Sequence, residues 1–333
     1  MSRTYGAAAR AFARPAPWTQ LALGPFAADV RDRLLQMPKT LPSKYLYDPL
    51  GSALFEAICR LPWYGVTRAE QRLLAREAEA IGLAADPVFL AELGPGSGEK
   101  LAVLAGGISR PSEPALHLHL IDISEAALDL ATHTLSDLPR TKITSARAAY
   151  EDGLRELDQV RPTYGRALVL FLGSNIGNFD LPEATRMLRA IRAALRPGDT
   201  LLLGADLVKP ERDLLLAYDD PLGVTAAFNK NLLARINTEL GASFVLDRFI
   251  HRAVWDAEGS RIEMHLVSLE EQEVDIPGAR CRVHFDRHET IWTESSYKYT
   301  TADIADLGTA AGFSQQDQWI DQEGQFALTL FAA

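Results

Sequence analysis

The segment Ala91-Glu92-Leu93-Gly94-Pro95-Gly96-Ser97-Gly98-Glu99-Lys100 follows an apolar run at 88–93 and opens a helical pattern. Glycines in such a turn let a ligand approach the backbone closely, because they carry no side chain. The turn is not a Walker loop, since Glu99 separates Gly98 from Lys100 and Leu101 follows. It is not the dinucleotide fingerprint either, because Gly98 follows Gly96 by two residues instead of three. We therefore predict a ligand-binding turn of another kind, between a strand and a helix.

Further apolar runs predict strands at 116–121, 143–145, 167–172 and 200–205, with helices such as 125–135 and 183–195 between them. Apolar strands that alternate with helices indicate a parallel sheet covered on both faces. Segments 315–321 and 325–331 flank a turn at Glu323-Gly324 and predict a terminal antiparallel hairpin. Five parallel strands and a reversed last strand are the layout of class I methyltransferases. We therefore expect an α/β fold with a mostly parallel, Rossmann-like sheet.

Asp122 ends the second predicted strand, where its carboxylate can accept hydrogen bonds from both hydroxyls of a ribose. The pattern of Gly94, Gly96 and Gly98 after the acidic Glu92 resembles motif I of the class I methyltransferases. The cofactor of these enzymes, S-adenosyl-L-methionine, has no phosphate and needs no phosphate cradle. The turn, Asp122 and the strand layout together favour this cofactor over a purely structural turn.

Two segments, 18–67 and 209–297, do not follow the alternation of strands and helices. The second contains stretches at 248–255, 261–268 and 280–293 that alternate like antiparallel strands. We predict a methyltransferase domain formed by 68–208 and 298–333, and an α+β lid domain formed by 18–67 and 209–297. Ligands of such sheets bind at the carboxyl edge of the strands, so the lid should cover that edge. Residues 1–17 are expected to be a flexible leader.

Composition excludes several classes of protein. A net charge of -10 gives no field that attracts nucleic acid or an anionic membrane, and no apolar run approaches the ~18 residues of a membrane helix. The two cysteines, Cys59 and Cys281, form no CxxC pair and indicate a reducing compartment. His284 and His288 on one strand would lie about 13 Å apart, too far for one metal ion. We expect a cytoplasmic monomer without a metal.

Six segments in order resemble the L-histidine Nα-methyltransferase family of ergothioneine biosynthesis, so that the likeness covers nearly the whole chain after the leader. They are 44–56, 61–70, 173–179, 217–220, 261–264 and 293–298. Any one of them alone would be unspecific, and the specificity comes from their number and order. Two departures are Ala149, where the family usually has an acid before the aromatic beside the adenine, and Gly65-Val66, which replaces a bulkier aromatic-proline pair.

The resemblance implies roles for residues at the matching positions. Gly94, Lys100 and Asp122 correspond to cofactor ligands, with Lys100 facing the methionine carboxylate, and Tyr150 corresponds to the aromatic residue beside the adenine. The implied substrate residues are Asn178 and Tyr218 at the carboxylate; Tyr64, Glu294 and Ser296 at the imidazole; Met264 beside them; and Tyr47 near the amine. Outside the family context, the tyrosines could be core residues, Glu294 a solvated charge and Asn178 a helix cap.

The expected reaction is an in-line displacement at a sulfonium methyl group by a neutral amine, so that catalysis is mainly positioning. We expect S-adenosyl-L-methionine to methylate the α-amino group of L-histidine, three times, giving N,N,N-trimethylhistidine (hercynine). An N-methyltransferase of another amine, such as tryptophan, is an alternative. Glu294 argues against it, because an indole offers one weak donor and no basic nitrogen. A protein that senses the cofactor or an amino acid without catalysis is a second alternative.

Overall fold

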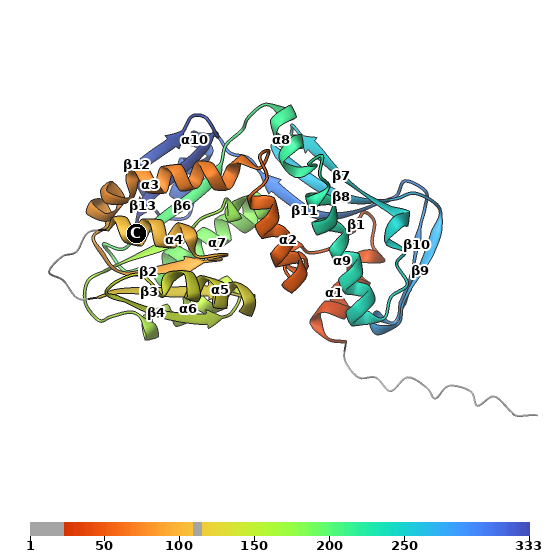
Figure 1. Ribbon diagram of the computed structural model, residues 1–333, viewed down its shortest axis with the longest axis horizontal. Helices are drawn as coiled ribbons and strands as arrows, with labels where there is room; N and C mark the ends of the chain where they lie inside the picture. Colours follow the sequence, from red (N-terminus) through yellow and green to blue (C-terminus); the bar gives the residue numbers. More distant parts are fainter. Residues whose placement is uncertain (1–22, 109–114) are drawn as a thin grey trace, which may run out of the picture.

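A computed structural model describes residues 23–108 and 115–333, and the predicted leader at 1–17 lies outside them. Figure 1 shows two lobes, one built on a large sheet and the other on smaller sheets, with α2 between them. Segments far apart in the sequence meet in the second lobe, where the N-terminal α1 and β1 lie beside elements from the region between β6 and α10.

The large sheet has the strand order β12-β13-β6-β5-β2-β3-β4. Its strands are β2 (Pro87–Leu93), β3 (Leu116–Asp122), β4 (Thr141–Arg147), β5 (Arg166–Phe171), β6 (Thr200–Asp206), β12 (Ser314–Asp321) and β13 (Phe326–Ala332). Strands β4, β3, β2, β5 and β6 are parallel, whereas β13 is antiparallel to both β6 and β12. The predicted five parallel strands and reversed last strand are confirmed, and β13 inserts between β6 and β12.

Helices cover both faces of this sheet. They are α3 (Gly65–Ala85), α4 (Glu99–Gly107), α5 (Glu125–Leu135), α6 (Tyr150–Val160), α7 (Leu181–Ala194) and α10 (Thr301–Ala310). Alternate strand residues face opposite sides, so that Leu90 packs with α3, α4 and α5, whereas Phe89 packs with α6, α7 and α10. Capping boxes at Asp180 and Thr300 satisfy the first backbone N–H groups of α7 and α10.

The second lobe combines an N-terminal segment with the region between β6 and α10. Its helices are α1 (Pro25–Leu34), α2 (Pro49–Cys59), α8 (Glu211–Tyr218) and α9 (Val224–Leu240), with 3-10 turns at Ser43–Leu46, Leu246–Arg248 and Pro277–Ala279. Its strands are β1 (Lys39–Thr40), β7 (Phe249–Asp256), β8 (Arg261–Ser268), β9 (Gln272–Ile276), β10 (Cys281–Phe285) and β11 (Thr290–Tyr297). One sheet has the order β1-β11-β8-β7, and β9 pairs with β10 in another.

The prediction of one continuous strand at 280–293 is wrong. The chain forms β10, turns at 286–289 and then begins β11 in a different sheet. His288 has a left-handed backbone (φ +71°), and the Glu289 N–H donates to the Asp286 carbonyl, which closes the turn. The strand β9 was not predicted. The domain boundary proposed at 67/68 falls inside α3, which begins at Gly65.

Candidate active site

The glycine turn joins β2 to α4 through left-handed backbone. Gly94, Gly96 and Gly98 have φ values of +74°, +54° and +78°, a region that strongly favours glycine. A Cβ on Gly94 would lie 2.7 Å from the Tyr150 hydroxyl oxygen and 2.9 Å from Asn175 Nδ2. At Gly96 the nearest atom to an added Cβ is Glu56 Oε1, at 3.6 Å, so this part of the backbone is open to a ligand.

Asp122 and Tyr150 lie at the ends of the next two strand–helix connections. Asp122 ends β3, and one of its carboxylate oxygens accepts from the Ser124 N–H at 2.8 Å. Burial raises the pKa of this carboxyl, and the backbone N–H groups of Ser124 and Ile123 oppose the rise. Tyr150 begins α6 and packs edge to face on Phe171, with ring centres 5.7 Å apart. Both residues therefore lie at the carboxyl edge of the sheet, where Asp122 was predicted.

A cluster of charged groups lies behind the turn. Glu92, in β2, is fully buried, and neither carboxylate oxygen has a hydrogen-bond partner within the described residues. Burial raises its pKa to about 8, while Lys100 acts to lower it. The Lys100 ammonium is 3.0 Å from Glu70 Oε2, and the Glu70 carboxylate also accepts from the Gly173 N–H. Sequence reasoning missed Glu70, although it lies within the segment 61–70.

These residues fit S-adenosyl-L-methionine. The glycine backbone offers a close approach, Asp122 offers an acceptor for hydroxyls, and Tyr150 offers an aromatic surface. Glu92 supplies a buried carboxyl without a partner, which an ammonium beside it would keep ionised, and Lys100 supplies an ammonium. These two groups suit the charged amino and carboxylate groups of a methionine. Ala149, the departure noted in the sequence, caps α6 through its carbonyl, which accepts from the Asp152 and Gly153 N–H groups.

One pocket brings together all seven residues predicted for catalysis and substrate binding. They are Tyr47, Tyr64, Asn178, Tyr218, Met264, Glu294 and Ser296. They come from the N-terminal segment, the loop after β5, the end of α8, and strands β8 and β11. The Asn178 loop also contains Asn175, which faces Gly94, so that the pocket adjoins the glycine turn. The pocket is also lined by residues that were not predicted, among them Phe55, Thr225 and Phe228.

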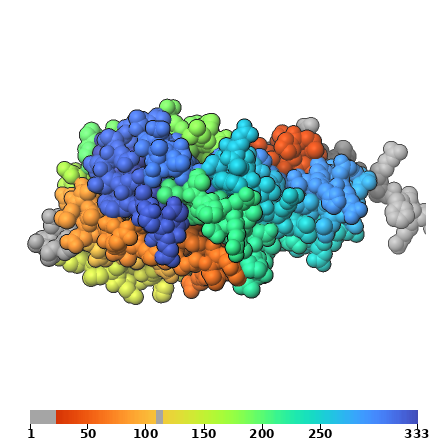
Figure 2. Space-filling view, turned by 90° about the horizontal axis from the view of Figure 1, so that it is seen from above, coloured from red at the N-terminus to blue at the C-terminus, as the bar shows by residue number. Residues whose placement is uncertain are grey.

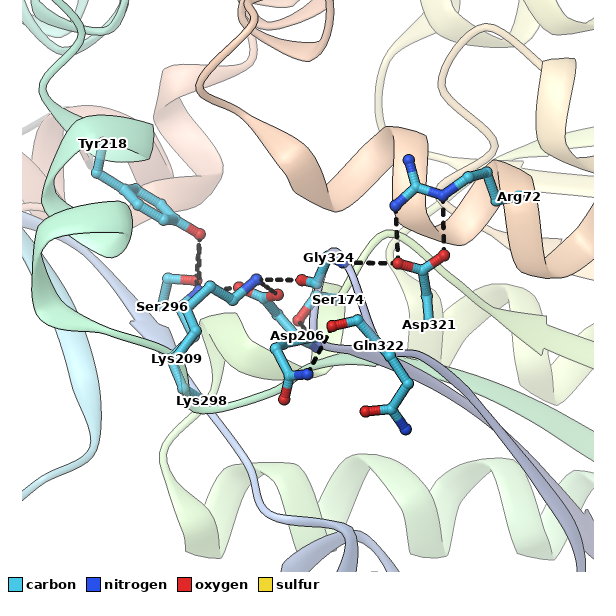
Figure 3. A network of polar contacts seen from close by, with 11 residues as sticks. Arg72, Ser174, Asp206, Lys209, Tyr218, Ser296, Lys298, Asp321, Gln322 and Gly324 are labelled. Carbon is cyan, nitrogen blue, oxygen red and sulfur yellow. Dashed lines mark hydrogen bonds and ion pairs between the residues drawn. The ribbon is translucent and has the colours of Figure 1, made fainter.

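One end of this pocket carries a buried set of hydroxyls and an ammonium. The hydroxyl oxygens of Tyr218 and Ser296 are 2.7 Å apart. The Lys298 ammonium lies 2.9 Å from the first and 2.7 Å from the second, and 3.1 Å from Asp206 Oδ2 (Figure 3). Lys298 was assigned no role in the sequence, although it ends the segment 293–298.

Glu294 and Tyr47 form another polar part of the pocket lining. Burial raises the pKa of Glu294 to about 7, while the charge of Lys298 and a hydrogen bond from the Tyr47 hydroxyl oppose this rise. Burial also raises the pKa of Tyr47 well above its usual range, and the Glu294 charge adds to this effect. Tyr47 is therefore a neutral phenol near pH 7. Its ring packs edge to face on Phe55 and Phe228.

The prediction that His284 and His288 lie on one strand is wrong, because His284 is in β10 whereas His288 is in the turn at 286–289. His284 lies near Asp286, at 3.2 Å. Within 23–108 and 115–333, no group of three or more histidine, cysteine, aspartate or glutamate side chains is arranged to hold a metal ion. No helix in the same residues is both long and apolar enough to span a bilayer.

The fold and the cofactor cradle define a class I S-adenosylmethionine-dependent methyltransferase. The model of one family within this class, described as histidine-specific and SAM-dependent methyltransferases, matches residues 26–333. The chain belongs to this family.

Three relatives illustrate how similar the chain is to known proteins and how much of each protein the similarity covers. A histidine N-alpha-methyltransferase of Mycolicibacterium smegmatis is 39% identical over 303 residues, which cover 91% of this chain and 93% of that protein. Ergothioneine biosynthesis protein 1 of Neurospora crassa is 28% identical over 85% of this chain and 32% of that longer protein. An L-tryptophan methyltransferase of Psilocybe serbica is 26% identical over 90% of this chain and 91% of that protein.

Proposed function

We propose that this pocket binds free L-histidine and presents its α-amino group to S-adenosyl-L-methionine, giving N,N,N-trimethylhistidine for ergothioneine biosynthesis after three transfers. The observation that carries the proposal is the single pocket that collects the seven residues beside the glycine turn. The cofactor, when bound, supplies an electrophilic methyl group. The residues of the chain bind the amino acid, orient its amine and exclude water.

Asn178 and Tyr218 are proposed to hold the substrate carboxylate. An amide N–H and a phenol O–H both donate, as an anionic acceptor requires. Thr225, Gly173 and Ser174 line the same pocket. The carboxylate is common to all amino acids, so these contacts supply affinity and orientation and do not select a side chain.

Glu294 is proposed to select the imidazole. With its pKa near 7, the carboxyl is largely ionised above neutrality and can accept a charge-assisted hydrogen bond from an imidazole N–H. Tyr64, Ser296 and Met264 border the same space. A phenyl ring in this position would leave the shielded carboxylate with Tyr47 as its one donor, and an indole would add only one weak donor, so that both rings are disfavoured.

Tyr47 is proposed to orient the amine and not to deprotonate it. Its phenol donates its one proton to Glu294, so the oxygen lone pairs remain free to accept from the substrate amine. A neutral phenol with a raised pKa is a poor base near pH 7. The amine must then lose its proton to solvent, and the pocket favours reaction by alignment.

Two alternatives are tested by one experiment. The relative that methylates tryptophan makes an indole substrate the second candidate, and a non-catalytic sensor is the third. Calorimetry with histidine and S-adenosylhomocysteine, followed by mass spectrometry of a mixture with S-adenosyl-L-methionine, separates them. We expect histidine binding and products heavier by one, two and three methyl groups. Methylation of tryptophan alone, or binding without any product, would contradict the proposal.

We further propose a cytoplasmic monomer that acts on a free amino acid. Cys59 and Cys281 carry free thiols, which is usual in a reducing compartment. The net charge of -10 disfavours nucleic acid and anionic lipid as partners. Light scattering during gel filtration should give the mass of one chain, and the mass of a dimer would contradict this.

A further inference from the structure

Lys298 is a buried ammonium that contacts the pocket only through other side chains. Its side chain is fully buried, and the three acceptors around Nζ are Ser296 Oγ, Tyr218 Oη and Asp206 Oδ2 (Figure 3). An ammonium has three donors and no acceptor, so these contacts can use all its protons. Lys298 does not line the pocket, whereas Tyr218 and Ser296 do.

The surrounding charges keep Lys298 protonated. Asp206, also buried, pairs with Lys298 and with Lys209, whose ammonium is 2.6 Å from the other carboxylate oxygen. Lys209 also donates to the Gly324 carbonyl. Although burial opposes the charge, the pKa of Lys298 is raised by Tyr218 and Asp206. Its positive charge therefore persists at every pH relevant to the reaction.

A count of the available protons determines which of the two hydroxyls, Tyr218 or Ser296, donates and which accepts. Both oxygens accept from Lys298, and they also share one hydrogen bond, which uses one of their two protons. A single proton remains to face the pocket. When a carboxylate lies beside Tyr218, that proton must come from Tyr218, and Ser296 then donates to Tyr218. Ser296 keeps one lone pair, which can accept from an imidazole N–H beside Glu294.

We propose that Lys298 is a positioning residue that makes Tyr218 the hydrogen-bond donor to the substrate carboxylate and gives this end of the pocket its positive charge. This rests on the proposed function and deepens it. Lys298 touches no substrate atom. It acts through Tyr218, because a phenol that accepts from an ammonium and from a hydroxyl is a stronger donor to an anion.

The test compares binding of histidine with binding of histamine, which keeps the imidazole and the amine but has no carboxylate. Calorimetry is done on the full chain saturated with S-adenosylhomocysteine. We expect Lys298→Met to raise the Kd for histidine about 10- to 100-fold. The titrations are done near pH 9, so that Glu294 stays ionised after the Lys298 charge, which lowers its pKa, has been removed. The Kd for histamine should then change much less than that for histidine, because histamine has no carboxylate to use this hydroxyl pair as a donor.

Lys209→Met is the matched control. It removes the second ammonium on Asp206 and costs stability, but it leaves Lys298, Tyr218 and Ser296 in contact. Its Kd for histidine should stay within about twofold of the native value. Equal weakening of histidine and histamine in Lys298→Met, or no weakening of either, would overturn the proposal. Failure of the native protein to bind histidine would instead overturn the proposed function.

If Lys298→Met does not fold, Tyr218→Phe provides a second test. It retains Lys298 and Asp206 but removes the hydroxyl through which Lys298 acts. Histidine affinity should fall about 10- to 100-fold, with histamine unchanged within about twofold. If Tyr218→Phe weakened both ligands alike, the phenol would not be the donor to the carboxylate, and Lys298 could not act through it.

Discussion

At the residue scale, Asp122 is expected to carry the ribose contact. Asp122→Ala should weaken binding of S-adenosylhomocysteine by about 1.5–3 kcal/mol, because two hydroxyls lose a charged acceptor. Asp122 also accepts from the Ser124 N–H, so Asp122→Asn is the control that keeps this turn contact. Calorimetric titration measures both variants. Unchanged affinity in the alanine variant would show that another residue binds the ribose.

Glu294 is the residue proposed to select the amino acid that is methylated. Glu294→Leu should lower kcat/KM for histidine roughly 30- to 150-fold, equivalent to about 2–3 kcal/mol, since an imidazole N–H is left unpaired. The kcat/KM for phenylalanine should not fall, because phenylalanine offers the Glu294 carboxylate no donor in the native protein. Asn178→Ala should lower kcat/KM by the same factor for histidine and for phenylalanine. Competition assays compare the two variants, and equal losses for both substrates in Glu294→Leu would remove the support for imidazole recognition.

The dependence of kcat/KM on pH is also set by individual groups, namely the Glu294 carboxyl and the substrate amine. The Glu294 carboxyl, with a pKa of about 7, must be ionised to accept from the imidazole, and the substrate amine must be neutral to attack. Both conditions improve as pH rises, so kcat/KM should increase from about pH 6 to 9. Glu294→Gln should retain only the part of the rise that the amine causes. A flat profile, with methyl transfer shown to limit the rate, would mean that the site deprotonates the amine itself.

The sequence could predict the members of the pocket but not the buried charges that support them. Tyr47, Asn178 and Glu294 were found because they occur in segments that resemble a known family. Glu70 and Lys298 lie in those segments too, but a charged residue gives no sign of burial in the sequence. Only the partners that the fold supplies, Gly173 for Glu70 and Asp206 for Lys298, explain why these charges are tolerated inside the protein.

At the scale of elements, prediction was best for the continuously apolar strands of the large sheet. The apolar runs of β2, β3, β5 and β6 lie within about one residue of the predicted strands, since these strands are buried on both faces. The stretch 280–293 failed because alternation continues across 286–289 in the sequence, whereas the chain turns there through a left-handed His288. The stretch contains no glycine that would have indicated the turn.

The backbone conformation at Gly98, where α4 begins, predicts how a substitution there changes stability. Gly98→Ala places a Cβ 2.9 Å from Ala131 Cα in a left-handed residue. We expect the free energy of unfolding to fall by about 1–3 kcal/mol. Gly106→Ala, in the same helix, has no atom within 4 Å of the added Cβ and should be neutral or stabilising by up to about 1 kcal/mol. Denaturant titration of both variants measures this. Equal stability of the two variants would contradict the strain at Gly98.

At the scale of the whole molecule, the pocket depends on both lobes. Tyr47 and Glu294 come from the second lobe, and Asn178 comes from a loop of the large sheet. Figure 2 shows the second lobe packed directly against the first in the space-filling view. A pocket shared in this way couples the lobes, because a ligand that contacts both stabilises their native arrangement together.

Thermal unfolding tests this coupling and the proposed division into two domains. A ligand at 100 times its Kd stabilises the native state by about 2.7 kcal/mol. For a chain of this size we expect an increase in Tm of roughly 3–5 °C with histidine added to the complex with S-adenosylhomocysteine. The increase should apply to one cooperative transition, since residues from both lobes line the pocket proposed for the ligand. Asn178→Ala should abolish most of the increase from histidine and leave that from S-adenosylhomocysteine, which binds at the glycine turn. Two separate transitions, of which histidine shifts only one, would show that the lobes unfold independently and that the substrate site belongs to one of them.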